Sequence, residues 1–179
     1  MIVDVAGTPV SLQAPLLLLG LVVPWLLFET WWSLRNERAL RAAGAIEPTD
    51  DVYAWMRVVY PGMFAAMTLE GVLAAPACTT LVSSGVAVFL AAKLLKWWAI
   101  VSLGRFWTFH VLVLPGATLV TGGPYRYMRH PNYVALMGEI AGVALMMRAP
   151  WAGAASVLAF GTLLVARIRV EERMLKEAR

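Results

Sequence analysis

The chain has little of what most metal sites and many catalytic sites are made from. Its 179 residues include one cysteine and two histidines. One cysteine excludes an intramolecular disulfide and a cysteine-rich metal site, and two histidines are too few for a histidine cluster without carboxylates. The sequence also lacks a Gly-x-Gly-x-x-Gly loop after a strand, a phosphate-binding loop, a His-Glu-x-x-His motif and a recognisable nucleophile elbow. Any cofactor must therefore be held by another kind of site, and we expect no metal.

Charged residues are also few, and apolar residues dominate. Hydrophobic residues make up 60% of the chain and charged residues 15%, whereas a soluble domain is about 45–50% apolar. Five apolar stretches approach the roughly 20 residues that cross a bilayer as a helix; they span about 10–32, 58–75, 81–103, 131–147 and 151–166. The sequence therefore predicts a single all-α integral membrane domain, residues 1–179, with about five transmembrane helices and no cleavable signal peptide.

Turn signals separate these stretches. A short polar helix with three arginines follows the first stretch and stops at Gly44. The second stretch is entered through Tyr-Pro-Gly at residues 60–62, and the uncharged residues 75–80 link it to the third as a helical hairpin. Residues 148–150, Arg-Ala-Pro, form another tight hairpin, and the fifth stretch continues as a helix into the charged tail.

Lysine and arginine are distributed unevenly over the connections, as membrane topology requires. The arginines after the first stretch, those in the 104–130 connection and the basic tail would lie on one side, whereas only Arg148 falls on the other. With five spans, the N-terminus lies outside and the C-terminus in the cytoplasm. This bias explains the net charge of +4. Because the basic residues form no single stripe, the charge does not suggest nucleic-acid binding.

Residues 122–133, Gly-Gly-Pro-Tyr-Arg-Tyr-Met-Arg-His-Pro-Asn-Tyr, concentrate hydrogen-bonding side chains between two apolar stretches. Such polar capacity beside a bilayer is costly unless it is used. Proline favours the first helical position, so Pro131 should begin a helix and His130 should cap it. A helix N-terminus flanked by arginine can bind a carboxylate or phosphate. The alternative is that the arginines and tyrosines only anchor the segment among lipid head groups.

A second polar cluster closes the chain. On a continuing helix Arg167 and Glu171 are four residues apart, as are Glu172 and Lys176. One interpretation is a solvated helix held by such pairs. The other is that Glu171 or Glu172 turns back towards Arg129 and closes a polar pocket at the membrane surface.

Charged residues inside the apolar stretches should face the bundle interior or one another. They are Glu29, Glu70, Lys93, Lys96 and Glu139. Glu139 lies about two turns into the fourth stretch, where it either lines a substrate cavity or is a paired structural charge. His110 is interpreted as a hydrogen-bonded structural residue.

Several short motifs follow one another along the second half of the chain. They are Leu103-Gly104, Trp107-Thr108, Gly123-Pro124-Tyr125-Arg126-Tyr127, Arg129-His130-Pro131-Asn132-Tyr133 and Arg167-x-Arg169-x-Glu171-Glu172. Together they resemble the motifs of the isoprenylcysteine carboxyl methyltransferase family, a group of small integral membrane enzymes that use S-adenosylmethionine. The resemblance covers about the last 90 residues well and the first two stretches only in hydropathy. Related phospholipid methyltransferases and sterol-reductase-like proteins share similar C-terminal signatures.

The resemblance implies a methyltransferase domain in the bacterial inner membrane, with its cofactor-binding half at about 96–179 and the cofactor pocket at the cytoplasmic face. The residues implied to hold S-adenosylmethionine are Tyr125, His130, Asn132, Tyr133 and Glu171. Those implied to be catalytic, by orienting the acceptor oxygen, are Arg129 and Glu172. Those implied to contact a lipophilic, membrane-embedded substrate are Trp98, Trp107 and Glu139. The methyl group of the cofactor is already activated, so the protein mainly has to align donor and acceptor.

The acceptor stays open at this point. The family acts on a prenylcysteine carboxylate, but residues 96–98, 114–116 and 132–135, followed by Glu139, resemble bacterial members proposed to methylate hydroxyl groups of alkylpyrones or alkylresorcinols. A phospholipid amine is a third acceptor class. Two other functions remain as alternatives: a nicotinamide-dependent membrane reductase of the sterol-reductase type, and a non-enzymatic membrane subunit or small carrier.

Overall fold

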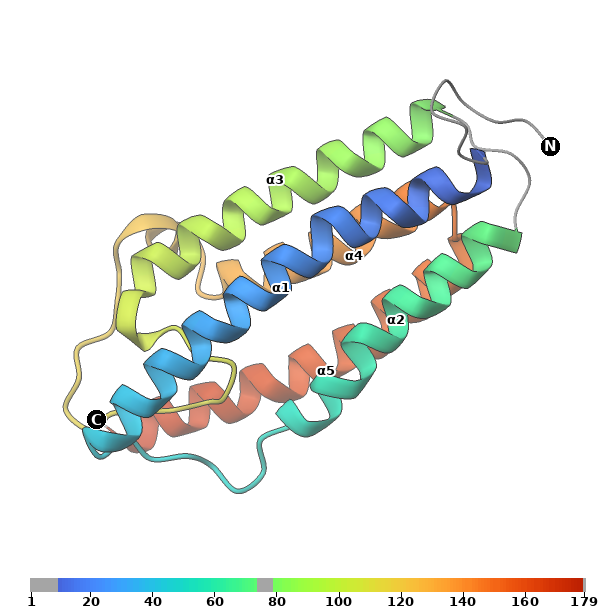
Figure 1. Cartoon of the computed structure of the whole chain (residues 1–179). Helices are drawn as coiled ribbons and strands as arrows, with labels where there is room; N and C mark the ends of the chain where they lie inside the picture. The colour runs from blue at the N-terminus through green and yellow to red at the C-terminus, as the bar shows by residue number, and fades with distance from the viewer. Residues whose placement is uncertain (1–9, 74–78, 179) are drawn as a thin grey trace.

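A computed structural model describes residues 10–73 and 79–178, and this part of the chain is built from helices (Figure 1). The long helices are α1 (Val10–Ala42), α2 (Tyr53–Leu73), α3 (Thr79–Leu103), α4 (Pro131–Met147) and α5 (Pro150–Glu177). Two short helical turns, η1 (Gly104–Phe106) and η2 (Gly123–Arg126), lie in the connection between α3 and α4. The predicted all-α class is confirmed for the described residues. Most of the predicted link at 75–80, with Cys78, lies outside them.

The long helices lie side by side in one bundle, and α4 contacts each of the other four (Figure 1). Successive helices run in opposite directions. The C-terminal ends of α1, α3 and α5 and the N-terminal ends of α2 and α4 therefore share one end of the bundle, together with the 104–130 connection. Because of this topology, the two polar clusters of the sequence meet in space.

Two boundaries differ from the predicted ones. The first stretch and the short polar helix after it form one uninterrupted helix, α1, which ends before Gly44 with φ +87°. Helix α2 begins at Tyr53 rather than near residue 58, and Pro61 lies inside it. The carboxylate of Asp51, two residues before the helix, accepts the backbone N–H of Tyr53 at 3.1 Å, and so provides a partner for one of the N–H groups that the first turn leaves without an intrahelical acceptor.

The other boundaries agree with the predictions. Pro131 begins α4 with His130 at the N-cap, and Arg148 ends it in the left-handed conformation with φ 54°. Pro150 then begins α5, which continues through the charged tail to Glu177.

Helices α3 and α4 approach each other closely at glycines. A Cβ atom on Gly142 would lie 2.7 Å from the backbone nitrogen of Phe89, and one on Gly85 would lie 2.4 Å from that of Met146. Small residues allow such backbone contact between helices. The buried residues around this contact form the main core; they include Met63, Phe64, Met67, Phe89, Leu136, Ile140, Val143, Met146, Phe160 and Leu164.

A buried charge cluster also joins the helices, and we call it the tetrad: Glu29 of α1, Lys93 and Lys96 of α3, and Glu139 of α4. Glu29 lies 3.0 Å from Lys93 and 2.6 Å from Lys96, and Glu139 lies 3.1 and 3.3 Å from the same two ammonium groups. Tyr60 of α2 donates a hydrogen bond to Glu139 at 2.5 Å. The four side chains are at most 5% exposed. The prediction that these charges face one another is confirmed.

Glu70 has a different role, at the opposite end of the bundle. Its two carboxylate oxygens accept the backbone N–H groups of Trp151 and Ala152 at 3.2 and 2.6 Å. These N–H groups belong to the first turn of α5, which has no intrahelical partner for them.

Two stretches of the described chain, Thr80–Phe106 and Pro150–Glu177, are long and apolar enough to cross a membrane, and α4 is a shorter apolar helix. The five-span count and the orientation of the termini stay predictions.

Candidate functional site

A cavity of about 580 Å³ opens at the end of the bundle where the two polar clusters meet. Its walls come from three segments: the connection after α3, the beginning of α4 and the end of α5. The predicted site residues that line it are Trp107, Tyr125, Arg129, His130, Asn132, Tyr133, Glu171 and Glu172. A volume of this size is typical of small-molecule sites, which occupy about 300–1,000 Å³.

Direct contacts between α4 and α5 form the charged wall. Tyr133 donates a hydrogen bond to Glu171 at 2.7 Å. His130 lies 3.4 Å from Glu172, and its ring stacks on Tyr133 with centroids 5.5 Å apart. The guanidinium of Arg129 is 3.8 Å from Glu172, but its side chain is 88% exposed. The glutamates therefore turn back towards the Arg129-His130 region, as one of the two interpretations of the tail predicted.

Arg167 of α5 connects this wall to the rest of the site. It is 5% exposed and pairs with Asp51 at 2.8 Å. Its Nε donates to the hydroxyl of Tyr133 at 3.2 Å, and its Nη2 donates to the backbone carbonyl of Phe109. A buried arginine with this many partners is fixed in place, so it holds α4, α5 and the 104–130 connection in one arrangement.

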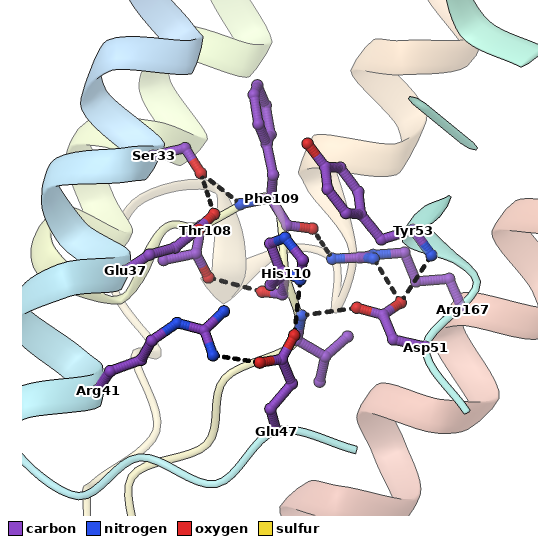
Figure 2. Close-up of polar contacts among 11 residues, drawn as sticks. Ser33, Glu37, Arg41, Glu47, Asp51, Tyr53, Thr108, Phe109, His110 and Arg167 are labelled. Atoms are coloured by element: carbon purple, nitrogen blue, oxygen red, sulfur yellow. Dashed lines mark hydrogen bonds and ion pairs between the residues drawn. The ribbon is translucent and has the colours of Figure 1, made fainter. Parts of the chain in front are cut away.

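Residues 107–113, which we call the strap, form one wall of the cavity without regular structure. Hydrogen bonds from α1 and from the segment before α2 hold the strap in place (Figure 2). Asn36 donates to the carbonyls of Gly104 and Trp107 at 2.9 and 2.8 Å. Ser33 accepts the N–H of Phe109 at 2.7 Å. Buried backbone polar groups need partners, and α1 provides them here.

The strap has further tethers at its second half. Asp51, in the segment before α2, accepts the N–H of Val111 at 3.0 Å. Val113 and Ile46 form an isolated antiparallel bridge with N–O distances of 2.8 and 3.0 Å. The segment between α1 and α2 therefore fixes the side of the strap that lies away from the cavity.

His110 contacts both the cavity and the segment between α1 and α2. It lines the cavity, and its Nδ1 lies 2.7 Å from a carboxylate oxygen of Glu47 (Figure 2). Arg41 donates a hydrogen bond to the other oxygen of Glu47. That bond from Arg41 lowers the pKa of Glu47, so Glu47 is ionised at neutral pH. His110 is hydrogen-bonded, as the sequence predicted.

Two polar atoms in the cavity wall lack partners within the described residues. The amide oxygen of Asn132 and the indole nitrogen of Trp107 are buried without a hydrogen bond. Such groups cost free energy unless a ligand or water completes their bonding. Burial also raises the pKa of the lining residue Tyr125, with a smaller contribution from Glu171. Across the described residues, no group of three or more histidine, cysteine or carboxylate side chains could hold a metal ion.

Two of the residues predicted to contact substrate, Trp98 and Glu139, do not line this cavity. Trp98 is 47% exposed on α3, and its ring lies 6.4 Å from that of Tyr127. Glu139 is fully buried in the tetrad. Of the two alternatives for Glu139, the structure shows the paired charge, because Lys93 and Lys96 are one turn apart on α3 and reach it together.

Several residues that shape the site are not marked by any sequence motif. Ser33, Asn36, Glu47 and Asp51 precede the recognised motifs and follow no pattern with them. The one available signal was the placement of polar residues on α1: Glu29, Ser33, Asn36 and Glu37 recur at helical spacing and share one buried face.

Comparisons with known proteins bear on the same region. The family model for the isoprenylcysteine carboxyl methyltransferase (ICMT) family matches residues 84–177. The uncharacterized protein YpbQ of Bacillus subtilis is 32% identical over 143 residues, which cover 80% of this chain and 85% of that protein. An uncharacterized protein of Haemophilus influenzae is 25% identical over 141 residues, covering 78% and 82%. No solved structure gives a significant match.

A third relative matches a shorter region. The cobalt-zinc-cadmium resistance protein CzcN of Cupriavidus metallidurans is 36% identical over 81 residues, which cover 45% of this chain and 38% of that protein. The family match includes the strap, α4 and α5, so it contains all three segments that line the cavity. Helix α1 and the segment before α2, which hold the strap, precede it.

Proposed function

Because the chain belongs to the isoprenylcysteine carboxyl methyltransferase family, we propose that it transfers a methyl group from S-adenosylmethionine to an oxygen atom of a lipophilic substrate. Family membership indicates a methyltransferase, and together with the two apolar stretches it points to a membrane protein. The cofactor, the acceptor oxygen and the cytoplasmic location of the site are the parts that we propose.

The observation that carries the proposal is the meeting of two separated motifs at one cavity. Residues 129–133 span the start of α4, and residues 167–172 lie near the end of α5, yet Tyr133 and Glu171 are hydrogen-bonded at 2.7 Å. A lipid anchor has no need for this arrangement, because head-group contacts only require exposed arginines and tyrosines. A site that binds a polar molecule does need it.

The residues present fit S-adenosylmethionine. Its ammonium group requires an anionic partner, and Glu171 and Glu172 both line the cavity. Its carboxylate suits the N-terminus of α4, where no side chain of the protein caps the helix. The buried amide oxygen of Asn132 lacks a partner and can accept a hydrogen bond from a hydroxyl or amino group. His130 and Tyr125 complete the predicted cofactor contacts.

The cofactor, when bound, supplies a methyl group on a positively charged sulfur. The residues of the chain then have to bind it, exclude water and orient the acceptor. In this proposal Arg129, which lines the cavity 3.8 Å from Glu172, attracts and orients an acceptor oxygen that carries negative charge. The strap contributes the apolar side of the cavity through Val111, Leu112 and Val113, which suits an acceptor with a long hydrocarbon chain.

Calorimetric titration of the detergent-purified protein tests the cofactor assignment. We expect S-adenosylmethionine and S-adenosylhomocysteine to bind in the micromolar range, and Glu171→Ala and His130→Ala to abolish binding. Tyr127→Phe is the matched control, because Tyr127 is 73% exposed and does not line the cavity. A monodisperse wild-type protein that binds neither ligand would contradict the proposal, and binding of a reduced nicotinamide instead would favour a reductase.

A further inference from the structure

His110 lines the cavity with a ring nitrogen that takes no part in holding the strap. Its Nδ1 is bonded to Glu47, while its Nε2 makes no hydrogen bond within the described residues. The side chain is 30% exposed and lines the cavity. A histidine that only holds the strap in place could lie entirely on the side of the strap that faces away from the cavity. His110 instead presents its imidazole ring to the cavity.

The partners of His110 determine which of its nitrogens carries the proton. Glu47 accepts two hydrogen bonds, one from Arg41 and one from the imidazole. An ionised carboxylate at Nδ1 holds the hydrogen there and leaves the lone pair on Nε2. The same carboxylate stabilises the imidazolium that forms when Nε2 takes up a proton. A carboxylate that orients a histidine in this way is the arrangement that activates histidine as a general base.

We infer that His110, oriented by Glu47, is a general base that removes the proton from a phenolic hydroxyl of the acceptor before or during methyl transfer. This inference rests on the proposed function and narrows its acceptor to a lipid phenol. A carboxylate is already ionised at neutral pH and needs no base, whereas a phenol has a pKa of about 10. A base in the cavity wall therefore has a purpose only for the weaker acid.

The proposed step is balanced without a further reactant. The O–H bond of the phenol breaks, its proton goes to Nε2 of His110, and the electron pair stays on oxygen. That oxygen forms the new bond to the methyl group, while the carbon–sulfur bond of the sulfonium donor breaks and its electrons return to sulfur. The donor becomes a neutral thioether, and the imidazolium later releases its proton to water.

The charges around His110 are compatible with this cycle. Tyr53, at the start of α2, packs against the ring with centroids 4.3 Å apart. The nearby ion pair between Arg167 and Asp51 holds the adjoining strap residues Phe109 and Val111. Glu47 and Arg41 face the Nδ1 side of the ring (Figure 2). The same Arg167 binds Tyr133, so the base and the proposed cofactor-binding wall belong to one connected network.

The test compares two acceptors, 5-pentadecylresorcinol as the phenol and N-acetyl-S-farnesylcysteine as the carboxylate. General-base catalysis contributes about 10²–10⁴-fold, so we expect His110→Gln to lower kcat/KM for the phenol by about a hundredfold or more. The rate with the carboxylate should change little.

Two further variants separate the dyad from its surroundings. Glu47→Gln should lower phenol methylation and spare the carboxylate, because a neutral partner stabilises the imidazolium less. Asp50→Asn is the matched control: Asp50 is in the same segment, but it pairs with Arg173 and does not line the cavity, so it should leave both rates unchanged. Thermal unfolding and S-adenosylhomocysteine affinity show whether each variant keeps its fold.

A measurement without the methyl donor gives an independent result. A dodecyl-substituted 4-nitrophenol changes its absorbance on ionisation, so its spectrum reports a proton transferred to the protein. We expect the bound probe to ionise at a lower pH on the wild type than on His110→Gln. Equal losses with both acceptors would overturn the inference, as would a wild type that methylates only the carboxylate or a probe that ionises alike on both proteins. Absent cofactor binding by the wild type would instead contradict the proposed function.

Discussion

The hydroxyl of Tyr133 donates a hydrogen bond to the carboxylate of Glu171 across 2.7 Å, although 38 positions separate them in the chain. The same hydroxyl accepts a hydrogen bond from Nε of Arg167 at 3.2 Å. One oxygen atom therefore joins the first turn of α4 to two positions of α5. The orientation of Glu171 in the cavity depends on this contact, because its other close polar neighbour, His130, is 3.9 Å away.

Removing that oxygen should weaken cofactor binding without unfolding the protein. Tyr133→Phe keeps the ring that stacks on His130 but leaves Glu171 without its donor. Hydrogen bonds to charged groups contribute about 1.5–3 kcal/mol, so we expect the S-adenosylhomocysteine dissociation constant to rise about 10- to 100-fold in calorimetric titration. Unchanged affinity would show that Glu171 does not contact the ligand. Tyr127→Phe should bind like the wild type.

The contact between α1 and the strap should affect the acceptor more than the cofactor. Asn36→Asp is nearly isosteric but cannot donate to the carbonyls of Gly104 and Trp107. Leaving buried carbonyls without partners costs about 1–3 kcal/mol, so the thermal midpoint should fall and the KM for the acceptor should rise. S-adenosylhomocysteine affinity should stay close to that of the wild type. Arg35→Gln, at a neighbouring exposed position of α1, should change none of these quantities, and equal effects of the two variants would contradict the assignment.

Removing one charge of the tetrad should destabilise the protein more than removing one positive and one negative charge together. Lys93→Met leaves an uncompensated buried carboxylate, and breaking a buried ion pair in this way costs about 3–5 kcal/mol. Adding Glu139→Gln restores neutrality and keeps an acceptor for Tyr60. The double variant should therefore be more stable than Lys93→Met alone in denaturant unfolding. A double variant with the summed loss of the two single ones would show that the charges are not coupled.

The glycine contact between α3 and α4 predicts a matched pair of alanine variants. In Gly142→Ala the new methyl group would meet the backbone of Phe89 at 2.7 Å, and overpacking typically costs about 1–3 kcal/mol. In Gly161→Ala nothing lies within 4 Å of the new Cβ, so the higher helix propensity of alanine should stabilise α5 by up to about 1 kcal/mol. Thermal unfolding in detergent distinguishes the two. Similar midpoints would argue against the close helix contact.

Tyr125 provides a prediction about pH. Burial disfavours its phenolate and raises its pKa above the ordinary value, so the hydroxyl stays protonated throughout the physiological range. Tyr125 therefore cannot act as the base at neutral pH, and Tyr125→Phe should keep the shape of the pH–rate profile while changing only its height. A profile whose shape changes in this variant would show that the hydroxyl of Tyr125 takes part in the proton transfer.

The sequence predicted the two helical segments that carry the site residues better than the contacts that hold these segments in place. Pro131 fixes the start of α4 because proline suits the first helical turn, and the spacing of Glu171 and Glu172 on a continuing helix placed them at the same end. The presence of charges inside apolar stretches predicted that they would pair, because an unpaired charge there costs too much free energy. Which charges pair was not predictable: Glu139 reaches Lys93 and Lys96 only through the packing of α3 on α4.

The course of the strap could not be predicted, because its conformation depends on contacts distant in sequence. Asn36 bonds to carbonyls 68 and 71 positions away, and Asp51 pairs with Arg167 across 116 positions. Single polar residues of this kind have no periodicity or motif to mark them. The residue type of His110 alone indicates only that its ring needs a hydrogen-bond partner. Only its neighbours Glu47 and Arg41 show that the ring is oriented, and they come from a different segment of the chain.

The positive charges of the tetrad both belong to α3, whereas its negative charges come from helices on either side of it in the chain. A fragment beginning at residue 84, where the family match starts, would retain two lysines and a single carboxylate of the four. Helix α1 therefore supplies a counter-ion as well as an anchor. In chimeras between relatives, an exchanged first helix must carry a carboxylate at the position of Glu29 or be matched by the loss of a lysine. During synthesis, Glu29 emerges before either lysine and finds its partners only when the third helix arrives.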